Sequence, residues 1–132
     1  MPVSPDMTGE IRSFFDAFVA AFAEFDGPLV ARRYAVPCIA VDAHGAVRAF
    51  HTAQEVGDYF QAVLTTYHGQ GCRSCRFGDL QVVPMGTLSA LASVSWELLR
   101  ADGSVASGWR ESYHLLRTGQ GWRVVASTDH AD

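Results

Sequence analysis

Two side chains, an aspartate and a histidine, are the main candidates for acid–base chemistry in this sequence. His114 lies within an otherwise apolar run, residues 113–116, and histidine is the commonest acid–base side chain near neutral pH. Asp42 ends an apolar segment and precedes Ala43-His44-Gly45. Each has an ordinary structural interpretation as well: a histidine that makes one hydrogen bond within a sheet, and an aspartate that bonds its own backbone in a turn. If both face one apolar pocket, their pKa values could be tuned toward neutral pH and they could move a proton.

The segment Cys72-Arg73-Ser74-Cys75 has the spacing of a metal or redox motif. A structural zinc site needs four ligands, and this motif supplies two. A redox C-x-x-C normally opens a helix, whereas this one opens a predicted strand, on which residues three apart face opposite sides. With Cys38 the chain has three cysteines, an odd number that forms no complete disulfide framework. We therefore expect reduced thiols and no metal site.

Helical spacing dominates the first third of the chain. Apolar residues recur at three- and four-residue steps, which predicts a helix that starts at Ser4-Pro5 or at Thr8. Its nearly all-aromatic face consists of Ile11, Phe14, Phe15, Phe18, Val19 and Phe22. Asp26-Gly27-Pro28 ends this helix, and proline suits the first turn of a second one, expected from Leu29 to about Tyr34.

Two short strands and a third helix are expected next. Pro37 should end the second helix, because the residue before a proline avoids helical angles. Residues 38–41 and 47–50 are typical of short strands on either side of a turn. Thr52, followed three residues later by a glutamate, has the capping-box pattern of a helix start, and His68-Gly69 should end that helix.

Beyond Gly71 the pattern predicts only strands, covering residues 72–83, 87–100, 105–117 and 122–128. Asp102-Gly103 is a strong hairpin signal. Alternation gives the long strand an apolar face made of Leu88, Ala90, Ala92, Val94, Trp96 and Leu98. We expect Glu97 and Glu111 on solvated or dimer-facing surfaces, and Asp129-His130 as a solvated tail. Helices followed by hairpins predict an α+β fold with a mostly antiparallel sheet, in one domain over residues 1–132.

Composition limits the range of functions. The chain has 132 residues, 48% of them hydrophobic, which is enough for one domain with a real core. Its net charge of -4 and scattered arginines argue against a nucleic-acid partner. We expect no membrane partner and a cytoplasmic location, because no apolar run could span a bilayer and the first residues do not resemble a signal peptide.

The order of these elements resembles the nuclear transport factor 2-like superfamily, in particular its SnoaL-like and ketosteroid-isomerase-like members. The resemblance extends from Ile11 to Thr128, and is most visible at Tyr34-Ala35, the strand ending at Asp42, the helix start at Thr52 and the closing hairpin of residues 117–124. It implies a cystatin-like cone, with three N-terminal helices packed on a strongly curved sheet and a pocket at the wide end. It also implies a homodimer formed through the sheet.

The resemblance further implies roles for single residues. Asp42 falls at the position of the catalytic base, and His114 replaces a proton-donating carboxyl group. Tyr34 matches a supporting tyrosine, whereas Phe60 replaces a second one. Phe18 replaces the tyrosine that binds the developing oxyanion, and a phenyl ring cannot donate a hydrogen bond, so we do not expect steroid isomerisation itself.

Taken together, these patterns predict a domain that binds a small, apolar organic molecule. The residues expected to line its pocket are Phe14, Phe18, Tyr34, Phe60, Val94 and Trp96. If the protein is an enzyme, Asp42 and His114 would serve as base and acid in an isomerisation, cyclisation or dehydration that needs no cofactor. The alternative is a non-catalytic module that uses its sheet to dimerise or to bind a protein. A cavity holding both residues favours the enzyme, and a filled cavity with an apolar outer face favours the module.

Overall fold

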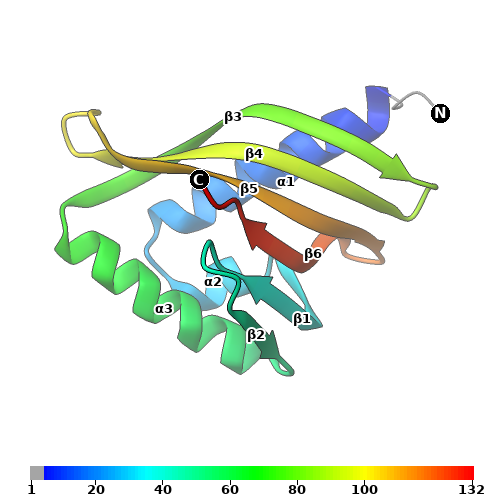
Figure 1. The fold of residues 1–132 in the computed structure, drawn as a ribbon, viewed down its shortest axis with the longest axis horizontal. Helices are drawn as coiled ribbons and strands as arrows, with labels where there is room; N and C mark the ends of the chain where they lie inside the picture. Colours follow the sequence, from blue (N-terminus) through cyan, green and yellow to red (C-terminus); the bar gives the residue numbers. More distant parts are fainter. Residues whose placement is uncertain (1–4) are drawn as a thin grey trace.

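Three helices cover one face of a bent six-stranded sheet (Figure 1). The computed structural model describes residues 5–132. The helices are α1 (Pro5–Ala23), α2 (Gly27–Ala31) and α3 (Ala53–Gly69). The strands are β1 (Tyr34–Val41), β2 (Val47–Phe50), β3 (Cys72–Met85), β4 (Ser89–Arg100), β5 (Val105–Thr118) and β6 (Gly121–Asp129). This arrangement confirms the predicted α+β, cystatin-like architecture.

The sheet has the strand order β2-β1-β6-β5-β4-β3. All neighbouring strands are antiparallel except β1 and β6, which are parallel. In β3 the register shifts between Gly78 and Gln81, and Asp79 has a φ of 51°, which marks a bulge that bends the strand. Figure 1 shows the long strands β3, β4 and β5 crossing α1, while the short β1–β2 hairpin lies beside α3. The bend leaves space between the hairpin, α3 and the inner face of the sheet.

The aromatic face of α1 forms the centre of the core, as its spacing predicts. Phe15 is fully buried, and its ring lies 6.0 Å from that of Trp96 and 5.4 Å from that of Tyr113. Of the predicted face, only Val19 is partly exposed. The inner face of β4 alternates as predicted from Ala90 to Leu98, whereas Leu88 lies in the turn before the strand and is 60% exposed.

The second helix is shorter than predicted, and the first strand is longer. Asp26 caps α2 by accepting a hydrogen bond from the backbone N–H of Leu29, so the helix starts at Gly27. It ends at Ala31 because the next residues already pair with the last strand: the carbonyl of Arg33 accepts from the N–H of Val124 at 2.9 Å. Tyr34 therefore starts β1, and the cis-proline Pro37 lies within that strand instead of ending a helix.

The third helix has the predicted bounds and a well-formed N-cap. The Thr52 hydroxyl accepts from the Glu55 N–H at 3.1 Å, and the Glu55 carboxylate accepts from the N–H of His51 at 3.3 Å. α3 packs closely on α2 at Gly27, where an added Cβ would lie 2.3 Å from a backbone oxygen of Gly57. This close contact sets the position of the helical wall of the pocket. Among residues 5–132, every helix is too short or too polar to span a lipid bilayer.

Candidate functional site

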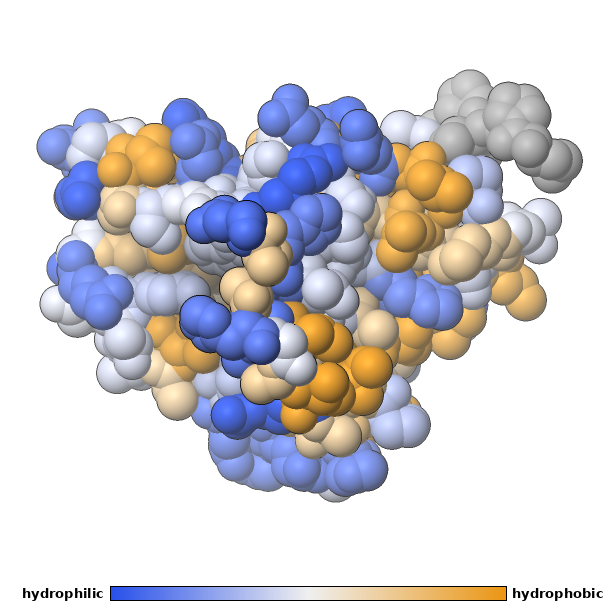
Figure 2. Space-filling model, viewed as in Figure 1, coloured by the Kyte–Doolittle hydropathy of each residue, from blue (hydrophilic) through white to orange (hydrophobic). Residues whose placement is uncertain are grey.

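A cavity of about 340 Å³ lies between the helices, the β1–β2 hairpin and the inner face of the sheet. Its walls are mainly aromatic, formed by Phe18, Phe22, Tyr34, Phe50, Tyr59, Phe60, Tyr67, Trp96, Trp109 and Tyr113. An apolar cavity of this size with a few polar groups is typical of a small-molecule site. Exposed Ile39 and Val47 line it as well, so its rim on the hairpin is apolar, and Figure 2 shows apolar side chains gathered over β1 and β2.

Two carboxyl groups meet inside this cavity. Glu111 of β5 and Asp129 of β6 are directly paired across the sheet, and both line the cavity. Glu111 is 9% exposed, and the indole N–H of Trp109 donates to its Oε1 at 2.9 Å. Burial, followed by the nearby charge of Asp129, raises the pKa of Glu111 to about 8. Burial also raises the pKa of Asp129. At neutral pH this acidic pair therefore holds one proton and one negative charge.

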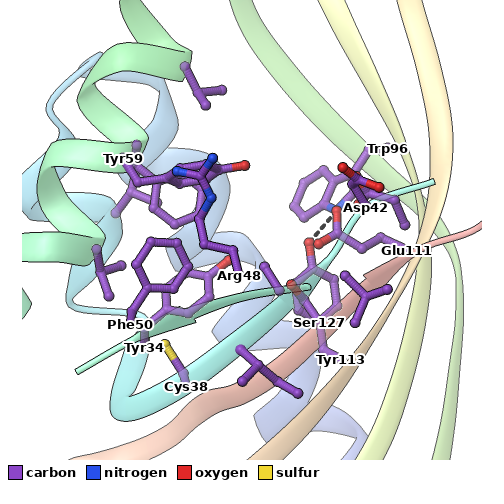
Figure 3. Close-up of a pocket in the computed structure, with 18 of the residues that line it drawn as sticks. Tyr34, Cys38, Asp42, Arg48, Phe50, Tyr59, Trp96, Glu111, Tyr113 and Ser127 are labelled. Atoms are coloured by element: carbon purple, nitrogen blue, oxygen red, sulfur yellow. Dashed lines mark hydrogen bonds between the residues drawn. The ribbon is translucent and has the colours of Figure 1, made fainter. Parts of the chain in front are cut away.

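A tyrosine connects the acidic pair to the core. The indole N–H of Trp96 donates to the Tyr113 hydroxyl at 2.7 Å (Figure 3). A hydrogen bond from the Tyr113 hydroxyl to Glu111 opposes part of the burial effect on the carboxyl pKa. Burial and then the charge of Glu111 raise the pKa of Tyr113 well above its ordinary value. Tyr113 therefore remains a neutral donor, which fixes the orientation of Glu111.

Asp42 lies at the rim of the cavity, in the turn between β1 and β2. It is exposed, and its Oδ1 accepts from the backbone N–H groups of Ala46 at 3.0 Å and His44 at 2.9 Å. These two hydrogen bonds lower the pKa of Asp42. Asp42 therefore bonds its own backbone in a turn, which is the structural alternative that the sequence offers. A carboxylate with a lowered pKa is a weak base.

His114 does not share the cavity with Asp42, so the expected pairing of these two residues is wrong. On β5 the neighbours of His114, Tyr113 and Leu115, are buried on the inner face, and alternation directs His114 to the outer face. It lies beside Leu91 of β4, and it is not among the residues that line the cavity. Neighbouring residues of a strand point to opposite faces of the sheet. His114 is one position away from the inward Tyr113, and its side chain is therefore separated from Asp42 by the sheet.

Four of the six residues expected to line the pocket do line it, namely Phe18, Tyr34, Phe60 and Trp96. Phe14 and Val94 are buried in the core outside the cavity lining.

The acidic pair is not among the sequence-based predictions, which place Glu111 on a solvated or dimer-facing surface and Asp129 in a solvated tail. The signal for Glu111 is present in the sequence: it alternates with Trp109, Tyr113 and Leu115, and in the sheet it lies opposite Val94 on the apolar face. Asp129 joins the cavity because β6 extends one residue beyond its predicted end.

Arg48 of β2 lies on the opposite side of the cavity mouth from the acidic pair. Its guanidinium is 4.9 Å from the ring centroid of Tyr59, within the range of a cation–π contact. Figure 3 shows Arg48 beside Tyr59 on the helix side, with Asp42, Glu111 and Trp96 on the sheet side. The cavity is therefore charged at its mouth and at one inner wall, and the rest of its lining is mainly aromatic and aliphatic.

The three cysteines are free and buried. Cys72 and Cys75 do not face opposite sides as expected: both are buried, because the register of β3 shifts between Cys72 and Ser74. Burial raises the pKa of each thiol, that of Cys75 to about 12, which leaves them unreactive. In the described part of the chain, no group of three or more His, Cys, Asp or Glu side chains is placed to hold a metal ion.

Comparison with known proteins identifies the family. No curated protein matches the chain. Among solved structures, a cystatin-like protein of unknown function from Nostoc punctiforme aligns with a TM-score of 0.79 at 14% identity, covering 100% of this chain and 96% of that one. The protein Aln2 from a Streptomyces species aligns with a TM-score of 0.77 at 17% identity, covering 100% and 95%. An NTF2-like protein from Novosphingobium aromaticivorans aligns with a TM-score of 0.75 at 16% identity, covering 94% and 80%.

At these identities the structural matches establish the fold and leave the function open. The family model described as "NTF2-like protein (DUF6841)" matches residues 9–132, which is nearly the whole chain. The suspected superfamily is thus confirmed, and the chain belongs to this NTF2-like family.

Proposed function

We propose that the cavity binds a small, largely apolar organic molecule and that the acidic pair, Glu111 and Asp129, transfers a proton to or from it. The observation that carries this proposal is the carboxyl pair itself: Glu111 is buried, Asp129 is half-buried and paired with it across the sheet, and both face one largely apolar cavity. Two carboxyl groups whose environments separate their pKa values can act as acid and base in one reaction. Here the proposed acid, Glu111, and the proposed base, Asp129, lie side by side on the sheet wall of one cavity.

In this proposal the two carboxyl groups have different roles. Asp129, the less buried member, accepts a proton from a carbon or oxygen of the bound molecule. Glu111, held neutral by its burial, donates its own proton to the atom on which negative charge develops. The proton moves from one part of the ligand to the pair and from the pair to another part, so no electron acceptor is required. Isomerisation, dehydration and cyclisation all contain such a step.

Tyr34 provides a further donor for the ligand. Its side chain lines the cavity, and its ring lies 5.1 Å from that of Phe60 and 6.2 Å from that of Phe18. Burial raises its pKa well above the ordinary value, so the hydroxyl remains protonated. A phenol donor in this position could replace the one that Phe18 cannot supply.

The test is exchange of carbon-bound protons for deuterium. The protein is incubated in D₂O with small apolar cyclic ketones such as 2-tetralone, and NMR follows deuterium incorporation next to the carbonyl group. We expect faster exchange than in buffer, and a loss of about 10²–10⁴-fold in Glu111→Gln. If no ketone exchanges faster than in buffer, or if Glu111→Gln exchanges as fast as the natural protein, the proposed acid–base role of the pair is wrong.

We also propose that the outer sheet face forms a homodimer with a second copy of the chain. Its apolar end consists of Val83, Met85 and Leu91, which are between 41% and 55% exposed. Val83 and Leu91 are directly paired, so the end is continuous. Sedimentation velocity would test the proposal: we expect a dimer that Leu91→Glu converts to a monomer, and a natural chain that is monomeric at all concentrations would disprove it. This interface is compatible with an occupied cavity, since it lies on the other face.

A further inference from the structure

Among the described residues, no arginine or lysine forms an ion pair with the acidic pair. The positive charge that lowers the pKa of Asp129 is that of His130, which follows it in the chain. The two ion pairs within residues 5–132, Arg76–Glu97 and Arg117–Glu10, contain no residue that lines the cavity. A buried negative charge without a cationic partner is costly, because it loses its hydration and gains little in return. The acidic pair reduces this cost by retaining one proton, but one negative charge remains at the inner wall.

The charges at the mouth do not neutralise this inner charge. Arg48 is the basic residue that lines the cavity, and it lies over Tyr59. Its charge helps to lower the pKa of Asp42, the acidic group of the rim. The rim therefore carries one positive and one negative charge that offset each other, and the net charge of the site is that of the acidic pair.

The remaining walls suit a cation. Tyr59, Phe60 and Tyr34 form a continuous row in which neighbouring ring centroids are 5.2 Å and 5.1 Å apart. Trp96 and Trp109 line the cavity from the sheet. Aromatic faces attract a desolvated cation through their quadrupoles, and tryptophan and tyrosine do so most strongly. Arg48 already lies over Tyr59. A positive group between Tyr34, Phe60 and the acidic pair would therefore meet aromatic rings on one side and the negative charge of the pair on the other.

We propose that the ligand carries a cationic nitrogen, as an amine or a quaternary ammonium group, attached to an apolar body. The nitrogen lies between the rings of Tyr34 and Phe60 and the acidic pair, and the apolar body fills the rest of the cavity. This inference rests on the proposed function and narrows its ligand class. It requires only that the ligand enters the same cavity.

Binding of such a ligand is coupled to the proton of the acidic pair. A cation favours ionisation of the pair, so the pKa of Glu111 falls when the ligand binds and a fraction of the bound protein loses the Glu111 proton. The fraction that retains this proton keeps the donor of the proposed reaction. Affinity therefore rises with pH until the pair of the free protein has lost its proton. His130, outside the cavity lining, also acts on the pair, because its charge lowers the pKa of Asp129. The other titratable or charged groups facing the cavity are Asp42, Arg48, Tyr34, Tyr59, Tyr67, Tyr113, Cys38 and Cys75. The pKa values of these tyrosines and thiols are raised and that of Asp42 is lowered, so they keep their charge across this range.

The experiment compares two probes of the same shape, phenyltrimethylammonium and tert-butylbenzene. Neither probe titrates, and quenching of the fluorescence of Trp96 and Trp109 reports binding inside the cavity. We expect the ammonium to bind about tenfold more tightly than the hydrocarbon, or better. Calorimetry in two buffers of different ionisation enthalpy should show a fraction of a proton released at pH 7. Glu111→Gln should lose the proton release but keep the preference, because Asp129 remains ionised. The double variant Glu111→Gln/Asp129→Asn should lose both, whereas Glu97→Gln, a matched change outside the cavity, should keep both.

The outcomes separate this inference from the proposed function. If the hydrocarbon binds as tightly as the ammonium to the natural protein, the cation is not recognised and this inference fails, while the apolar cavity remains a binding site. If neither probe binds, both proposals are wrong. The comparison of probes on the natural chain decides the point even if Glu111→Gln does not fold.

Discussion

The rim of the cavity and its inner wall hold the same chemical group in opposite states. At the rim, Asp42 is exposed, bonded to two backbone N–H groups, and its pKa is lowered. At the inner wall, Glu111 is buried next to a second carboxyl group, and its pKa is raised. The difference arises from solvent and neighbours alone, and it is the reason for which we propose the carboxyl group of the wall, and not that of the rim, for proton transfer.

The comparison also explains why a position in a motif is an unreliable guide to a catalytic group. Asp42 occupies the place of a family base, yet its carboxylate is committed to its own turn. Asp129 has no such motif, yet it lies beside Glu111 where a proton can be shared. The chemical environment is created by the fold, and the fold brings β5 and β6 together.

The largest expected effect is on the rate of proton exchange, when an aspartate is replaced by asparagine either in the acidic pair or at the rim. Asp129→Asn should slow the deuterium exchange of a bound ketone by about 10²–10⁴-fold, because the base of the pair is lost. Asp42→Asn should leave the rate unchanged, and so should His114→Ala on the outer face. The rates are measured by NMR on the three variants and the natural protein. A loss in Asp42→Asn with full activity in Asp129→Asn would reverse our assignment.

The next effect is on stability as a function of pH. The pKa of Glu111 is raised in the folded state, so between about pH 4.5 and about pH 8 the folded chain binds more protons than the unfolded chain. The free energy of unfolding should therefore fall as pH rises through this range, by at most about 1.4 kcal/mol per pH unit. Urea titrations at pH 5.5, 7 and 8.5 would measure the slope. Glu111→Gln should flatten it, and an equal slope in that variant would show that the slope arises from other groups.

Much of the fold follows from local patterns in the sequence. The all-aromatic face of α1, the Thr52 cap of α3 and the alternation along β4 each depend on residues close together in the chain, and each appears in the structure as predicted. The end of α2 depends instead on a backbone hydrogen bond from Val124 to Arg33, which are far apart in the sequence. A local pattern contains no information about that contact.

The site was only partly predictable, for the same reason. Four aromatic residues of the cavity could be identified because they belong to periodic faces. Glu111 could have been placed inside by following the alternation from Tyr113. However, a carboxyl group on an inward face suggests that the predicted register of the strand is wrong by one residue, unless its partner is known. That partner, Asp129, comes from another strand, and only the pairing of β5 with β6 brings the two together.

A smaller effect on stability should come from the hydrogen bond beneath the acidic pair. Trp96→Phe keeps an aromatic ring but removes the N–H that donates to the Tyr113 hydroxyl at 2.7 Å. Leaving this buried hydroxyl without its donor should cost about 1–3 kcal/mol of stability, measured by urea unfolding. Exchange activity should fall less than in Asp129→Asn, because Tyr113 only positions Glu111. An activity loss as large as that of Asp129→Asn would mean that Trp96 contacts the reacting molecule directly.

The smallest effect is expected at the rim, and its pH dependence should run in the opposite direction. The pKa of Asp42 is lowered by its hydrogen bonds to Ala46 and His44, so its contribution to stability is present above the unfolded pKa and is lost as pH falls through the folded pKa. Asp42→Ala should therefore lower the melting temperature slightly at pH 7 and not at all in strong acid, where the carboxyl group is protonated. Because the group is fully exposed, solvent screening keeps this difference below the one at Glu111. Melting curves of the variant and the natural chain at pH 7 and pH 2.5 would measure it. If the loss at pH 7 exceeded that caused by Trp96→Phe, the rim would be more than a self-contained turn, and Asp42 would have to support the cavity through contacts beyond its own backbone.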